Sequence, residues 1–122
     1  MKKYFYVLIA FIIFSCGGSD TYQGKWKAMD ASKAKFDIVF STKSFSITDS
    51  IGKTKSYNYN QNSFAFENST ATYGIELGDG RAYEIYFPTS SREVALILDE
   101  NKNQMFTISR KDYINYDDIY KL

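Results

Sequence analysis

The sequence has no histidine, one cysteine and one proline among its 122 residues. Without histidine the chain cannot build a Ser-His-Asp or Cys-His nucleophilic site, and a single cysteine forms neither a zinc site nor an intramolecular disulfide. The chain also has almost no net charge, because 15 basic residues balance 14 acidic ones. Nucleic-acid binding needs a basic surface that releases phosphate counterions, so we expect no nucleic-acid partner.

Carboxylates are the remaining groups that could carry chemistry. Glu76 and Glu84 are expected near each other on paired strands, which is the arrangement of a glycosidase-like acid/base pair. Both alternate with apolar neighbours, however, and this pattern predicts that they face solvent. Asp112, Asp117 and Asp118 do not have the spacing of a calcium-binding loop. The sequence therefore predicts no catalytic residue, no metal site and no cofactor, and a protein that is not an enzyme.

Residues 1–15 have the layout of a secretory signal. Lys2 and Lys3 precede an uncharged apolar run over residues 4–14. A membrane-spanning helix needs about 20 apolar residues, so this run is too short to remain in a membrane, and it matches the apolar region of a signal peptide. The segment Ile-Phe-Ser-Cys at residues 13–16 resembles the bacterial lipobox, in which the signal is cleaved directly before the cysteine.

Cys16 is therefore the predicted lipidation site, because a thiolate is a soft nucleophile that a diacylglyceryl donor can alkylate. One acyl chain anchors a protein only marginally, whereas two or more, such as palmitate chains, hold it stably. We expect a lipoprotein signal peptide over residues 1–15, a lipidated tether over residues 16–21 and a folded domain over residues 22–122. The domain would lie outside the cytoplasm, on a bacterial cell membrane or outer membrane. The alternative is a buried free cysteine in an ordinary signal peptide or N-terminal helix.

The folded domain is dominated by short segments in which apolar and polar residues alternate, the pattern of half-buried strands. Turn-forming residues separate these segments, Gln61 and Asn62 among them. Short links without a helical crossover predict an antiparallel up-and-down meander, and eight or nine such strands avoid bare edges by closing into a barrel. The tyrosine spacing after residue 112 allows a short C-terminal helix. The expected fold is all-β, with strands at residues 25–29, 35–40, 44–48, 57–60, 64–67, 73–77, 83–87, 94–98 and 106–108.

The hairpin around residues 78–80 can be predicted to its register. A two-residue loop at Asp79 and Gly80 would place Ile75 opposite Glu84 and bring a charge onto the apolar face. A three-residue loop over residues 78–80 instead pairs Ile75 with Tyr83 and keeps the faces consistent. Such loops need a residue in the left-handed conformation, which a glycine supplies. We therefore predict the three-residue loop.

Gly24, Lys25 and Trp26 open the first strand, and Arg110 follows the last. This combination resembles the Gly-x-Trp motif and C-terminal arginine of the lipocalin-like (calycin) barrels. The resemblance implies that Trp26 closes one end of the barrel and that Arg110 lies across its ring in a cation–π contact. The general layout also resembles small lipoproteins of streptococci and their relatives, a resemblance that implies no activity.

Two binding hypotheses remain for the barrel. An eight-stranded barrel is just wide enough to be filled by side chains or to hold one small ligand. The bulk of the inward aromatic residues favours a filled interior whose outer surface contacts a protein or an envelope glycan, and the aromatic and amide side chains of residues 57–62 suit sugar binding. The alternative is a carrier that holds a small apolar ligand inside the barrel. The candidate ligand-binding residues are Phe36, Phe40, Phe45, Tyr57, Tyr59, Phe64 and Tyr83.

Overall fold

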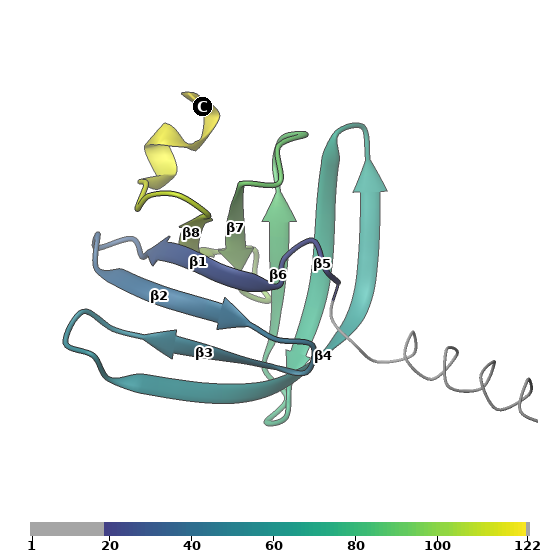
Figure 1. Ribbon diagram of the computed structural model, residues 1–122. Coiled ribbons are helices and arrows are strands. Elements are labelled where there is room, and N and C mark those ends of the chain that lie inside the picture. The colour runs from purple at the N-terminus through teal and green to yellow at the C-terminus, as the bar shows by residue number, and fades with distance from the viewer. Residues whose placement is uncertain (1–18, 122) are drawn as a thin grey trace, which may run out of the picture.

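The computed structural model describes residues 19–121, with side chains as far as Asp118. The predicted signal peptide over residues 1–15 and Cys16 lie outside this range. Eight strands pair in chain order and close into one antiparallel barrel (Figure 1), so the all-β meander is confirmed. The strands are β1 (Gly24–Met29), β2 (Lys35–Phe40), β3 (Ser44–Thr48), β4 (Thr54–Glu67), β5 (Thr70–Leu77), β6 (Ala82–Phe87), β7 (Val94–Leu98) and β8 (Gln104–Ser109).

β4 is one long strand where the sequence predicted two. It pairs with β3 over its first residues and with β5 over the rest, and its register shifts between Gln61 and Ser63. The predicted turn at Gln61 and Asn62 is therefore wrong, because these residues form a β-bulge, which bends a strand without ending it. Gly74 lies opposite the bulge, where an added Cβ would collide with the Ser63 hydroxyl. The bend lets β4 pair with β3 over its first part and with β5 over its second part.

Four hairpin turns lie at the same end of the barrel, since each odd-numbered strand turns back into the next even-numbered strand there. The β5–β6 turn has the predicted three-residue loop, and Ile75 pairs with Tyr83 as expected. Its last loop residue, Gly80, has a φ of +94°. The other three turns repeat this hydrogen-bond pattern, with their loops at residues 31–33, 50–52 and 100–102. We call this end the mouth.

An aspartate begins three of the four mouth hairpins. The carboxylate of Asp99 accepts hydrogen bonds from the backbone N–H groups of Asn101 and Asn103, both at 2.9 Å. Asp30 and Asp49 accept the equivalent pair of bonds in their own turns. Short aspartate side chains favour such turns because they satisfy local N–H groups that have no strand partner. The rim of the mouth is thus built from short, internally bonded turns.

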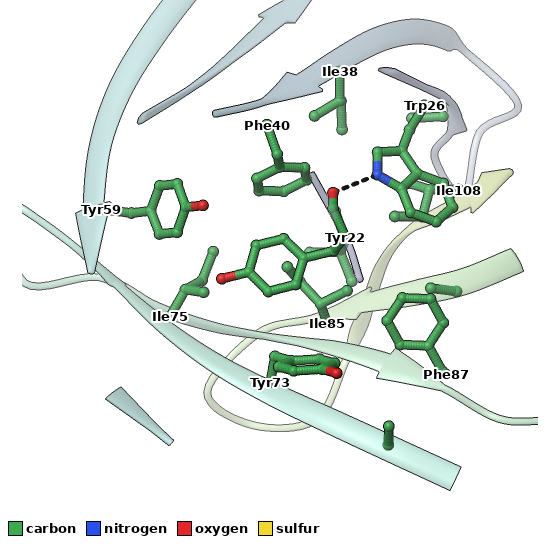
Figure 2. Packing of buried hydrophobic residues seen from close by; sticks show 14 of the residues in the cluster. Tyr22, Trp26, Ile38, Phe40, Tyr59, Tyr73, Ile75, Ile85, Phe87 and Ile108 are labelled. Atoms are coloured by element: carbon green, nitrogen blue, oxygen red, sulfur yellow. Dashed lines mark hydrogen bonds between the residues drawn. The ribbon is translucent and has the colours of Figure 1, made fainter. Parts of the chain in front are cut away.

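The opposite end of the barrel, which we call the closed end, is filled by aromatic side chains. Figure 2 shows the Tyr22 ring between Phe40, Tyr59 and Tyr73, with centroid distances of 5.3, 6.3 and 5.2 Å. The Trp26 indole N–H donates a hydrogen bond to the Tyr22 carbonyl at 2.8 Å, and only 2% of Trp26 is exposed. The chain therefore crosses the closed end before it enters β1.

The C-terminal segment covers the outer surface of the barrel beside β7. It ends in a 3-10 helix, η1 (Tyr116–Lys121), in the segment where the sequence allowed a short helix. Val94 and Leu96 are buried on the outer face of β7 and pack against Ile114. This cover explains why β7 is a continuous apolar run, since both of its faces are buried.

Candidate binding cavity

A cavity of about 210 Å³ lies inside the mouth of the barrel. This volume exceeds the roughly 150 Å³ of an apolar cavity that binds benzene, and it is smaller than the roughly 300 Å³ at which drug-sized pockets begin. The space therefore suits a single ring system or a short aliphatic chain. It is lined by Ile38, Phe40, Phe45, Ile47, Tyr57, Ile75, Leu77, Arg81, Tyr83, Ile97, Met105 and Phe106.

The floor and the walls of the cavity differ in burial. Ile38, Phe40 and Ile75 form a fully buried floor, whereas Phe45 and Tyr57 are only partly buried in the wall. These residues occupy alternate positions on their strands, so their side chains point into the barrel. The rings of Phe40 and Phe45 lie 5.2 Å apart, and those of Phe45 and Tyr57 lie 5.3 Å apart. A continuous row of rings thus runs from the floor to the rim.

Arg81 is the charged residue of the lining, and its charge is already paired. Its Nε and Nη2 atoms lie 2.9 and 2.8 Å from Oδ2 of Asp79, and its guanidinium lies 5.3 Å from the centre of the Tyr57 ring. The hydrogen bond from Arg81 lowers the pKa of Asp79, so both groups stay charged over the physiological range. An anionic ligand would have to displace Asp79, and the cavity therefore favours uncharged apolar molecules.

Four of the candidate ligand-binding residues line the cavity, namely Phe40, Phe45, Tyr57 and Tyr83. The other three lie elsewhere for identifiable reasons. Tyr59 is deep in the closed end, where its hydroxyl donates to the Ser41 carbonyl at 2.6 Å and burial raises its pKa. Phe36 packs edge-to-face on Phe106, at 5.4 Å, beside the cavity. Phe64 is 55% exposed on the part of β4 that extends beyond β3.

Sequence reasoning missed eight of the twelve lining residues, and Ile47, Arg81 and Met105 illustrate why. Ile47 has the same alternation as Phe45, so the pattern contained the signal for it. Arg81 directly follows the β5–β6 turn and Met105 is the second residue of β8, so both side chains can reach the cavity from the rim. Alternation identifies the faces of a strand, but it does not indicate at which end of the barrel a position lies.

The expected contact between Trp26 and Arg110 is present at the closed end. The guanidinium carbon lies 3.7 Å from the centre of the indole ring, and Arg110 donates hydrogen bonds to the carbonyls of Lys25 (3.0 Å) and Thr21 (3.1 Å). Partial burial lowers the pKa of Arg110. Gly24 is required here twice over, because its φ is +98° and a Cβ would lie 3.2 Å from the guanidinium. Arg110 thus covers this end of the core.

The carboxylates considered for catalysis lie on the outer surface. Glu84 forms an ion pair with Lys102, with 2.6 Å between Oε1 and Nζ. The strand partner of Glu84 is Gly74, and Glu76 is exposed two positions after Gly74 on β5. Across residues 19–121, the structure places no three potential metal ligands of the His, Cys, Asp or Glu type together. The arrangement of these groups offers a solvated surface and no enclosed reaction site.

No protein-family model, curated protein or solved structure matches this chain. Among the residues that the structure describes, no helix is both long and apolar enough to cross a membrane.

Proposed function

We propose that this protein is a lipoprotein, anchored by acylated Cys16 on the extracytoplasmic side of a bacterial membrane, whose barrel binds a small apolar molecule in its mouth. It acts as a binding protein and not as an enzyme. The observation that carries the binding role is the cavity of about 210 Å³, whose floor is buried and apolar and whose wall is a row of aromatic rings. Ligand sites typically combine such a lining with few polar groups.

The alternative, a glycan-binding outer surface, receives less support. Tyr57 and Tyr59 point into the barrel, whereas Asn58 and Asn60, which alternate with them, are exposed on the outer face. A sugar site of the kind considered above needs the rings and the amides on one surface. Residues 57–62 divide these groups between two faces of the sheet.

The contact between Arg110 and Trp26 supports the resemblance to the lipocalin-like barrels. It joins the first and last strands at the closed end, opposite the end of the barrel at which the cavity lies. We propose that the chain shares this general design of one closed end and one open end.

Native mass spectrometry of residues 19–122, produced without the lipid, tests the binding role. We expect a co-purifying molecule of a few hundred daltons that is removed by organic extraction. Ile47→Trp, which fills the cavity from the wall, should abolish this bound mass. Val39→Trp is the matched control, because Val39 lies on the neighbouring strand β2 and faces outward with 37% exposure. A bare protein mass, or equal ligand binding by both variants, would overturn the cavity as the site.

A further inference from the structure

We propose that Phe64 and Phe66, with Arg92, contact the membrane surface and orient the barrel so that its mouth faces away from the membrane. We call these three residues the hairpin patch. The inference rests on the lipid anchor of the proposed function. The hairpin patch would be a second contact with the membrane besides the lipid, and the two contacts together would fix the orientation of the barrel.

The hairpin patch is an apolar sheet face that nothing in the described chain covers. Phe64 and Phe66 are 55% and 62% exposed, although they lie on the same face as the buried residues Tyr73 and Ala71 that pair with them. The reason is that β3 pairs only with residues 54–58 of β4, so the far half of β4 extends past the barrel wall with β5. The β4–β5 hairpin projects in this way in Figure 1.

Ser19, the first residue that the structure describes, lies beside the hairpin patch. The backbone N–H of Ser19 donates to Oε1 of Gln61 on β4 at 3.0 Å, three positions before Phe64. Phe64 stacks on Tyr73 at 4.9 Å, and the Tyr73 hydroxyl donates to Thr21 at 3.1 Å. Two residues lie between Cys16 and Ser19, and the three steps along the chain span at most about 10 Å. A lipid on Cys16 therefore keeps this edge of the barrel at the membrane surface.

The chemistry of the hairpin patch suits the interface between lipid headgroups and acyl chains. The Arg92 guanidinium lies 6.0 Å from the centre of the Phe66 ring and 5.4 Å from that of Phe87. Aromatic rings beside an arginine combine apolar surface with a cation that attracts phosphate groups. Glu67 is on the opposite face of β4 from Phe66, because successive side chains in a strand point to opposite faces.

The predicted orientation follows from the hairpin patch. The patch, residue 19 and the β4–β5 turn lie at or near the closed end, whereas the cavity opens between the four mouth hairpins. A barrel held at the membrane by the patch therefore exposes its cavity to the aqueous side. Its ligand would be taken from solution and not from the bilayer.

Spin labelling of the mature lipoprotein in phosphatidylethanolamine–phosphatidylglycerol vesicles tests this arrangement. The acylated Cys16 is the only natural cysteine, so an introduced cysteine is the only free thiol. A nitroxide on Ser69→Cys at the β4–β5 turn should be reached by oxygen but shielded from a water-soluble nickel complex. The control label on Ile51→Cys, 83% exposed at the mouth, should be open to the nickel complex. Phe64→Ser combined with Phe66→Ser should raise nickel access at residue 69 roughly tenfold, because the rings no longer insert.

The outcomes separate the orientation from the anchor. Equal nickel access at residues 69 and 51 would overturn the orientation while leaving the anchor in place. Shielding of residue 69 from both reagents, in detergent as well as in vesicles, would mean that a protein or a second copy covers the patch, and would also overturn it. An intact mass without the diacylglyceryl group would overturn the anchor itself, and the orientation with it.

Discussion

The two ends of this barrel are made from the same strands and the same residue types, yet one is filled and the other is hollow. At the closed end, residues 19–23 cross the barrel and contribute Tyr22, whose hydroxyl donates to Gln61 at 2.8 Å. At the mouth, the strands are joined by three-residue turns that are too short to place a side chain inside. The difference shows that connecting segments, more than the size of the strand residues, decide where an eight-stranded barrel is empty.

The two ends also differ in the partners of their polar groups. The hydroxyls of Tyr22, Tyr59 and Tyr73 and the Trp26 indole N–H all have hydrogen-bond partners at the closed end. Buried polar groups with partners rigidify a core. In the cavity wall the rings of Phe45 and Tyr57 pack against each other, and the one charged residue of the lining, Arg81, lies over the Tyr57 ring and pairs with Asp79 at the rim. We expect the closed end to determine stability and the mouth to determine binding.

The strongest test of this comparison is a pair of aromatic truncations. Trp26→Ala should lower the free energy of unfolding by about 3–5 kcal/mol, because it empties a fully buried site and removes the ring beneath Arg110. Tyr57→Ala should cost about 1–2 kcal/mol, since that ring is only partly buried in the cavity wall. Urea unfolding measures both losses. Equal losses would mean that the two ends contribute alike to stability.

Acidification should act on the mouth rather than on the closed end. Hydrogen bonds from the backbone N–H of Asn103 and then of Asn101 lower the pKa of Asp99 in the folded state. The stabilising effect is therefore present above the unfolded value of about 3.9 and is lost as the pH falls through the lower, folded pKa.

Asp99→Asn checks this assignment, because the amide oxygen can still accept the N–H bonds but cannot titrate. Unfolding free energies measured from pH 5 downward should fall less steeply with pH for this variant than for the natural chain. Parallel slopes for the two proteins would show that the Asp99 carboxylate does not stabilise its hairpin.

The smallest predicted effect concerns two mouth turns with the same hydrogen bonds but different residues. Lys33 has a φ of +70° at the position that Gly80 occupies in its own turn. Lys33→Gly should stabilise the fold by about 0.5 kcal/mol, because relief of left-handed strain slightly exceeds the entropy cost of glycine. Gly80→Lys should destabilise it by about 1 kcal/mol. Shifts of the same sign in the urea midpoint would contradict the equivalence of the two turns.

Much of the fold followed from local patterns in the sequence. Alternation located the strands, and the requirement to keep Glu84 off the apolar face predicted the register of the β5–β6 hairpin. The bulge in β4 was missed because Gln61 and Asn62 have turn-forming character in either structure, and only the pairing with β5 decides between them. Residues 19–21, expected in the tether, bond to Gln61, Tyr73 and Arg110.

The site itself was predictable only in part. Four aromatic residues of the cavity were predicted because they occupy the inward-facing positions of their strands. Tyr59 and Phe64 also occupy inward-facing positions, yet they lie outside the cavity. Their positions depend on which end of the barrel is crossed by the chain and on how far β4 extends past β3. Both are long-range properties of barrel closure, and no short stretch of sequence encodes them.

The three-residue turns of the mouth also have a kinetic consequence. In many binding proteins a long loop folds over the bound molecule, and its opening limits release. Each of the four turns at this rim is closed by its own hydrogen bonds, so none of them can act as a lid. Ligand exchange should then proceed in one step, with association set by diffusion into the mouth and residence time set by the contacts inside. A protein of this design would equilibrate quickly with its surroundings, which suits sampling of a solute more than long-term storage.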